Sequence, residues 1–120
     1  MENENPDIFW FEKSGKQCLR FDFGEQLTES EAGAAIIKWR EAFESKKGQK
    51  IVLIWNCTGM RGYETGARTL WTSALKEMKS QIAQIWLISD STFIRMGASV
   101  MGVFSSLDIN SVGIEDEIVI

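Results

Sequence analysis

The segment best suited to chemistry is a glycine-dotted loop, Thr58 to Gly66, which follows an apolar run and leads into a helical pattern. Open α/β sheets place their binding sites at such strand-to-helix turns. The glycines invite comparison with phosphate-binding loops, but the loop contains neither Gly-Lys-Ser/Thr nor Gly-x-Gly-x-x-Gly. Because glycines alone more often mark tight turns, we do not expect nucleotide hydrolysis at this loop.

Other residue types narrow the chemistry further, because the sequence contains no histidine. The usual general base at neutral pH and the commonest metal ligand are therefore missing. Cys18 and Cys57 match no metal-ligand spacing and are expected to be reduced thiols of a cytoplasmic protein. Glu25 has no sequence neighbour that suggests a tuned acid pair, and Asp90 is expected to cap a helix. We therefore expect no enzymatic activity, no metal and no cofactor.

Length and composition predict one soluble domain. The chain has 120 residues, of which 44% are hydrophobic and 25% charged, as in ordinary globular proteins. Thirteen basic and seventeen acidic residues give a net charge of −4, and the scattered bases argue against a nucleic-acid partner. Residues 1–7 are polar and are expected to form a flexible arm before a domain over 8–120. No signal peptide is expected, and no apolar run approaches the ~18 residues of a membrane span.

Strand patterns alternate with helical patterns along this domain. Residues 8–11 and 18–23 predict a β-hairpin, and the apolar runs 51–55 and 85–88 predict two buried strands. A short last strand is expected near Ser111 to Ile114. Since helices separate these strands, we expect parallel pairing with right-handed crossovers, which is the α/β class.

Three helices should position the loop against the sheet. A capping box, Thr28 with Glu31, opens the first of them, and Ser89 to Thr92 can cap the third. The five tryptophans are expected to pack in the core. Glycines and serines in the third helix suggest close packing or a close partner along it, and Glu115 to Glu117 is expected to be a solvated acidic patch. The expected inward stripes are Ala32, Ala35, Ile36, Trp39 and Phe43; Ala67, Leu70, Trp71, Ala74, Leu75 and Met78; and Phe93, Gly97, Val100, Met101, Phe104 and Leu107.

Two short motifs flank the loop. Asn56-Cys57-Thr58-Gly59 spans its start, Glu64-Thr65-Gly66-Ala67 spans its end, and Phe23-Gly24-Glu25-Gln26-Leu27 lies upstream. This arrangement resembles the STAS domain, the fold of the anti-sigma factor antagonists. That family has Asp-Leu-Ser-Gly after a buried strand, Asp-Ser-Ser-Gly before an amphipathic helix, and an upstream Gly-Glu-Leu-Asp turn. The resemblance implies a STAS-like single domain with a central mixed sheet covered by amphipathic helices.

The resemblance also implies a switch. The family's phosphoacceptor is the first serine of the second motif, and the matching position here is Thr65. The simpler interpretation from the residues is that Thr65 caps the second helix, since threonine is a favoured cap. This chain departs from the family's motifs, with asparagine at 56, glutamate at 64 and glycine at 66.

We therefore expect a non-enzymatic regulatory domain that binds a protein partner, with Met60 and Tyr63 as exposed apolar anchors. The resemblance implies an anti-sigma factor, a serine kinase or a PP2C-type phosphatase as that partner, and whether the chain forms a homodimer is left open. The alternative is a small-molecule or lipid carrier, which requires an apolar pocket of roughly 300 Å³ or more. The predicted partner-binding residues are Thr58, Gly59, Met60, Arg61, Tyr63, Glu64, Gly66 and Arg68, beside the phosphoacceptor Thr65.

Overall fold

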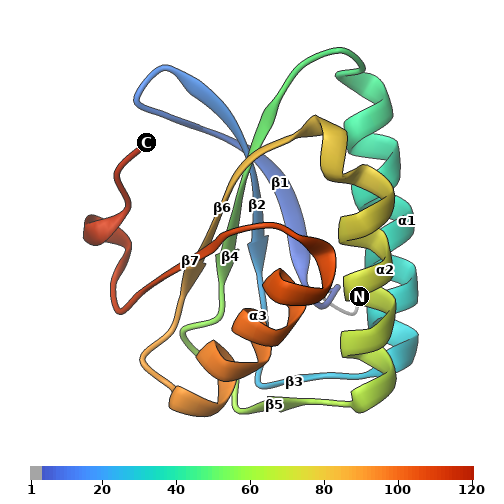
Figure 1. Cartoon of the computed structure of the whole chain (residues 1–120), viewed down its shortest axis with the longest axis vertical. Helices are drawn as coiled ribbons and strands as arrows, with labels where there is room; N and C mark the ends of the chain where they lie inside the picture. Colours follow the sequence, from blue (N-terminus) through green and yellow to red (C-terminus); the bar gives the residue numbers. More distant parts are fainter. Residues whose placement is uncertain (1–3) are drawn as a thin grey trace.

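A five-stranded mixed sheet forms the centre of the molecule (Figure 1). The computed structural model describes residues 4–120. The strand order is β1-β2-β4-β6-β7; β1 is antiparallel to β2, and the other neighbours are parallel. The predicted hairpin and parallel pairing are thus confirmed. The strands are β1 (Asp7–Lys13), β2 (Lys16–Asp22), β4 (Ile51–Asn56), β6 (Ile82–Ile88) and β7 (Ile109–Val112).

Three helices pack on one face of this sheet and bury the main core against it. Two two-residue strands, β3 and β5, pair with each other at the edge of the fold where β2 and β4 end. The helices are α1 (Glu29–Ser45), α2 (Thr65–Met78) and α3 (Thr92–Ser105), the short strands are β3 (Gln26–Leu27) and β5 (Gly62–Tyr63), and two 3₁₀ turns are η1 (Lys79–Gln81) and η2 (Glu115–Glu117).

Helix α1 begins with the capping box that its sequence predicts. The Thr28 hydroxyl accepts a hydrogen bond from the Glu31 amide at 3.1 Å, and the Glu31 carboxylate accepts one from the Thr28 amide at 3.0 Å. These two bonds satisfy donors that a helix start leaves unpaired. The buried face is the predicted one in full: Ala32, Ala35, Ile36, Trp39 and Phe43.

Four aromatic residues, one each from β2, α1, β4 and α2, meet beneath the helices. Phe21, Trp39, Trp55 and Trp71 have ring centroids 5.2–6.5 Å apart, mostly in edge-to-face arrangements. This geometry suits the ring quadrupoles and adds to the gain from burying large apolar surfaces. The cluster therefore fixes both helices against the sheet.

The expected stripe of the third helix is correct in part: Gly97 is buried, and Met101 and Leu107 pack against the core, but the other members do not. The helix turns Ile94 and Ala98 into the core, while Phe93, Val100 and Phe104 are exposed. Because α3 is apolar on nearly all sides, the spacing of its residues did not determine which side faces the sheet. On α2, Leu70 is likewise at the surface rather than in the core.

Both ends of the described chain are held more tightly than expected. Asn5 bonds the Gln26 carbonyl and accepts from the Gly24 amide, and Pro6 is buried, so the expected flexible arm does not extend to these residues; residues 1–3 lie outside the described part. At the other end, β7 begins two residues before the expected strand. Glu115 is not merely solvated, since it forms an ion pair with Arg20.

The aromatic cluster generates a stability prediction. Replacing Trp39, which is fully buried, with alanine should lower the free energy of unfolding by about 3–5 kcal/mol, because it leaves a cavity among three other rings. Urea unfolding followed by circular dichroism measures this change. Ile37→Ala, at an exposed position of the same helix, is the matched control and should cost under about 0.5 kcal/mol. Equal losses in the two variants would contradict the assigned role of the cluster.

Candidate functional site

The loop from Thr58 to Gly66 is fixed at its middle by main-chain hydrogen bonds. The amides of Arg61 and Gly62 both donate to the Glu25 carbonyl, at 2.7 and 3.2 Å. The amide of Glu64 donates to the Leu27 carbonyl at 2.9 Å, which continues the β3–β5 pairing. The loop follows the carboxyl end of β4, where the sequence places it. It is therefore a shaped surface rather than a loose connection.

The start of α2 differs from the expected threonine cap. Glu64 occupies the cap position, and Thr65 is the first residue of the helix. Glu64 does not cap its own helix, because its carboxylate accepts from the Glu29 amide at the start of α1, at 2.6 Å. Thr65 is exposed, and its hydroxyl has no hydrogen-bond partner within residues 4–120.

The starts of α1 and α2 lie side by side, with the Glu29 carboxylate against Gly66. A Cβ atom at this position would overlap the carboxylate of Glu29. The carboxylates of Glu29 and Glu64 thus both lie at the start of α2, where Thr65 is the first residue at the positive end of the helix dipole. Among the described residues, the guanidinium groups of Arg61 and Arg68 form no ion pair.

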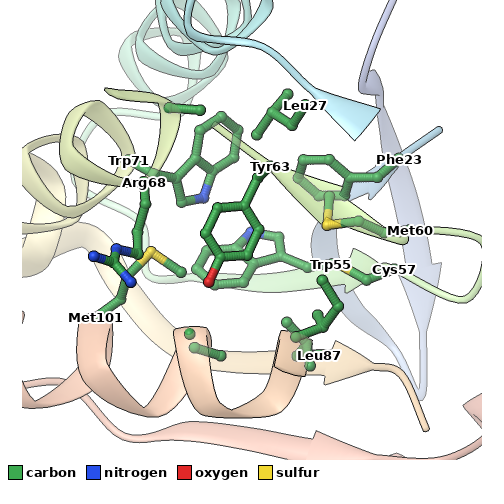
Figure 2. A pocket seen from close by; sticks show the side chains of 14 residues that line it. Phe23, Leu27, Trp55, Cys57, Met60, Tyr63, Arg68, Trp71, Leu87 and Met101 are labelled. Atoms are coloured by element: carbon green, nitrogen blue, oxygen red, sulfur yellow. The ribbon is translucent and has the colours of Figure 1, made fainter. Parts of the chain in front are cut away.

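A small apolar cavity lies beneath the loop, as Figure 2 shows. Tyr63 lies over it, with its ring stacked on Phe93 at a centroid distance of 5.3 Å and its hydroxyl against Gly97. Met60 lines the cavity and is only 7% exposed. The expectation that Met60 is an exposed anchor is therefore wrong, because its side chain fills space between β4 and the helices.

The cavity is too small for the ligand of the alternative hypothesis. Its volume is about 40 Å³, well below the roughly 300 Å³ typical of small-molecule sites. The lining residues with polar groups are Trp55, Cys57, Tyr63, Arg68 and Trp71, and the Trp55 indole nitrogen has no hydrogen-bond partner within the described chain. A second hollow, between α3 and β7, is wide open and mostly polar, so it does not supply the missing apolar volume.

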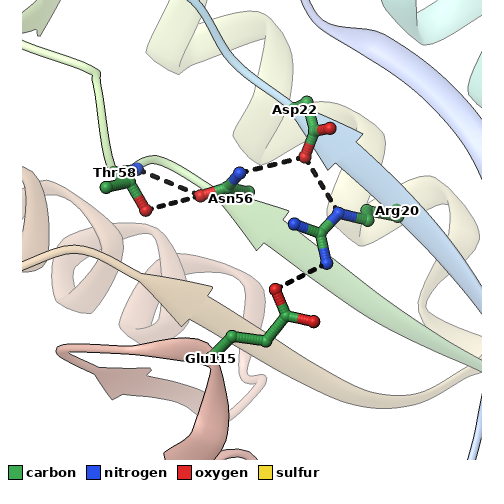
Figure 3. Close-up of polar contacts among 5 residues, drawn as sticks. All are labelled: Arg20, Asp22, Asn56, Thr58 and Glu115. Carbon is green, nitrogen blue, oxygen red and sulfur yellow. Dashed lines mark hydrogen bonds and ion pairs between the residues drawn. The ribbon is translucent and has the colours of Figure 1, made fainter.

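The base of the loop is anchored by polar side chains that the sequence analysis did not connect (Figure 3). Asn56 accepts from the Thr58 hydroxyl at 2.6 Å and donates to Asp22 at 3.1 Å. Arg20 bonds Asp22 at 2.9 Å and Glu115 at 3.0 Å. Burial alone would lower the pKa of Arg20, but the hydrogen bonds to Glu115 and Asp22 outweigh that effect and raise it. The predicted site residue Thr58 is therefore partly engaged within the protein.

The predicted site residues thus divide by exposure. No local sequence pattern predicts the hydrogen bond between Glu64 and the start of α1, because the two residues are 35 positions apart. In the described chain no three His, Cys, Asp or Glu residues gather as metal ligands, and no helix is long and apolar enough to cross a membrane. Thr58, Gly59, Arg61, Glu64 and Thr65 are exposed, Tyr63, Gly66 and Arg68 are half-buried, and Met60 is buried.

The thiol of Cys57 generates a prediction of low reactivity. Burial raises the pKa of Cys57 from 9.0 to about 12, and burial also raises the pKa of Cys18. At pH 8 the thiolate fraction of Cys57 should be about 1,000-fold lower in the folded than in the unfolded chain. A thiol reagent such as 5,5′-dithiobis(2-nitrobenzoate) should react with both cysteines in urea and with neither in buffer. Rapid labelling of the folded protein would contradict this burial.

The same shift predicts a loss of stability in alkali. The folded-state pKa of Cys57 is raised, so its contribution to stability is present below pH 9 and is lost as pH rises toward 12, because only the unfolded thiol ionises. Urea midpoints measured from pH 8 to 11 should therefore fall less steeply for Cys57→Ala than for the wild type. Parallel curves would show that this thiol does not govern the change.

The contact between Tyr63 and Gly97 generates a further prediction. Gly97→Ala places a methyl group where the Tyr63 ring lies, so it should displace the ring and destabilise the fold by about 1–3 kcal/mol. Tyr63 is the only tyrosine, so the rate of its nitration by tetranitromethane, followed by mass spectrometry, measures its exposure. This rate should be higher in Gly97→Ala than in the wild type. Gly33→Ala, which meets open space on α1, should instead stabilise by about 1 kcal/mol and leave nitration unchanged. Unchanged nitration in Gly97→Ala would contradict the contact.

Comparison with solved structures shows which known fold this chain resembles. No protein-family model matches the sequence, and no curated protein sequence matches it. The structure is similar to the crystal structure of an uncharacterized protein of the DUF3478 family with a SpoIIAA-like fold, from Shewanella loihica PV-4. The TM-score is 0.78 at 13% sequence identity, over 98% of this chain and 93% of that chain. At this identity the likeness concerns the fold alone. The expectation from the two loop motifs is confirmed to that extent: the chain has a SpoIIAA-like, and thus STAS-like, α/β fold.

Proposed function

We propose that this chain is a non-enzymatic regulatory domain that binds a protein partner through residues 58–66 and the first turn of α2. The observation that carries the proposal is the combination of a fixed backbone with unused polar groups. Glu25 and Leu27 hold the loop by main-chain bonds, while the Arg61 guanidinium and Thr65 hydroxyl have no partner within residues 4–120. Because the loop backbone is already ordered in the free protein, a partner would bind this surface with little loss of conformational entropy.

The binding surface differs from the one expected from the sequence in its apolar part. With Met60 buried and Tyr63 stacked on Phe93, the exposed part consists of Thr58, Gly59, Arg61, Glu64 and Thr65. This composition favours a partner that recognises charge and main chain rather than one that inserts into an apolar groove. An anti-sigma factor, a serine kinase or a PP2C-type phosphatase is the partner class that we propose from the STAS-like fold.

We further propose that phosphorylation of Thr65 switches this binding. A phosphate would add about −1.5 to −2 charges beside the carboxylates of Glu29 and Glu64, although the α2 amides would favour it. The repulsion would weaken the bond from Glu64 to the Glu29 amide and alter the surface that the partner meets. Binding would then fall on modification.

Charge reversal at Arg61 tests the binding surface. Protein retained on the immobilised wild type is identified by quantitative mass spectrometry, and its affinity is then measured with the purified partner by calorimetry. Arg61→Glu should weaken binding at least about tenfold, because it removes and reverses an exposed charge at the loop centre. Lys79→Glu reverses an exposed charge at the far end of α2 and is the matched control, with unchanged affinity expected.

Thr65 is tested with the same purified partner. Thr65→Glu should reproduce the loss of binding, and Thr65→Val should retain it. A partner that binds Arg61→Glu as tightly as the wild type would place the interface elsewhere. Phosphate that a copurifying kinase adds at another position, or no phosphate at all, would contradict the switch.

A further inference from the structure

Helix α3 carries two apolar stripes, of which the fold uses one. The first, formed by Ile94, Ala98 and Met101 at steps of four and three residues, faces the core, and the buried polar Ser105 follows four residues later. A second stripe, at steps of three, four and three, faces away from it. Its members, with the neighbouring Phe104, form what we call the outer seam: Phe93 (56% exposed), Met96 (63%), Val100 (39%), Val103 (78%) and Phe104 (64%).

The outer seam has the spacing by which one helix packs on another. Alternating steps of three and four residues keep apolar side chains on one line of a helix, as at the contact line of a two-helix coil. A helix that is apolar on all sides is ordinarily buried on all sides. In Figure 1, α3 (orange) lies at the front of the molecule with no other element in front of it. The single chain therefore leaves this seam uncovered.

The charges around the seam fit a second copy of the same chain. The only charged residue of α3 is Arg95, which is half-buried and donates to the Ser89 carbonyl at 2.6 Å, away from the seam. Two copies that met along α3 would place no like charges opposite one another at the centre of the contact. Asp90 and Asp108 lie beyond the two ends, where charges remain hydrated. A partner selected by charge would find no complementary group on the seam.

The area of the seam fits a reversible dimer. Together its five side chains expose the equivalent of about three whole large side chains, roughly 500 Å² for each copy. Two copies would bury roughly 1,000 Å² from these residues alone, near the lower limit for a specific interface. Interfaces of this size are typical of weak, reversible association, whereas obligate dimers usually bury about 2,000 Å² or more.

We infer that the chain forms a symmetric homodimer in which the outer seam of α3 packs against the same seam of a second copy. This inference does not depend on the proposed function, because it concerns another surface and needs no partner protein. The two surfaces adjoin, since Tyr63 of the loop stacks on Phe93 of the seam. Dimerisation would therefore cover Phe93 and hold Tyr63 in place over the cavity.

Sedimentation equilibrium of the purified full chain between 5 and ~200 µM tests the dimer. The wild type should change from monomer to dimer over this range. Raising the salt concentration from about 0.05 to 0.5 M should strengthen the association, because two copies that each carry a net charge of −4 repel less when screened. Val103→Glu should raise the dissociation constant at least about 100-fold, since it would bury a charge in the contact.

Matched variants separate the seam from a general effect of added charge. Val103 is 78% exposed, so at about 5 µM, where the wild type is expected to be monomeric, Val103→Glu should keep the wild-type circular dichroism and unfolding temperature. Ile37→Glu adds the same charge at an exposed apolar position of α1 and should leave the dimer intact. In Val100→Cys, near the middle of the seam, copper-phenanthroline oxidation should cross-link two chains, and the buried Cys18 and Cys57 should not compete.

Three outcomes would overturn the inference. The first is a wild type that remains monomeric at the highest concentration, and the second is a dimer that Val103→Glu does not weaken. The third is a monomeric wild type that cosediments with phosphatidylcholine vesicles while Val103→Glu does not, which would assign the seam to a lipid surface. Retention of the partner by Val103→Glu would leave the proposed function standing while the dimer is lost, so the two failures are distinguishable.

Discussion

The contact among Phe21, Trp39, Trp55 and Trp71 is the constraint on which the rest of the structure depends. Each ring comes from a different element, so the cluster fixes α1 and α2 against β2 and β4 at once. The indole nitrogens of Trp39 and Trp55 find no hydrogen-bond acceptor in the described chain, which indicates that packing outweighs polar satisfaction at this point. Because both helices are fixed in this way, their starts lie side by side.

That neighbouring arrangement shapes the candidate site. The Glu64 carboxylate reaches the Glu29 amide only because the two helix starts adjoin, and the Glu29 carboxylate in turn lies against Gly66. On the other side of the loop, Asn56 ties its first residues to Asp22 and, through Arg20, to the C-terminal segment. The loop is consequently held from both ends, and its exposed side chains are the groups left over from these internal contacts.

The sequence predicted the fold well where local signals and burial agree. The capping box at Thr28, the inward stripe of α1 and the apolar run of β4 each carry a periodicity that the tertiary structure also requires. The phase of α3 could not be predicted, because a helix that is apolar all round has no preferred side until its neighbours are known. The capping of α1 by Glu64 and the pairing of Arg20 with Glu115 were likewise hidden, since each joins residues far apart in the chain. Met60 was misassigned because composition alone does not distinguish an interface methionine from a core methionine.

The bond between Glu64 and the Glu29 amide couples the loop to the helix behind it. It makes the first turn of α1 part of the loop's own conformational equilibrium, although the two segments are 35 residues apart in the chain. The coupling is reciprocal. A molecule that immobilises Glu64 stabilises the first turn of α1 against fraying, and an intact first turn of α1 favours the binding of that molecule by the same free energy. Occupancy of the loop would thus be communicated to the helix behind it without any change in the sheet.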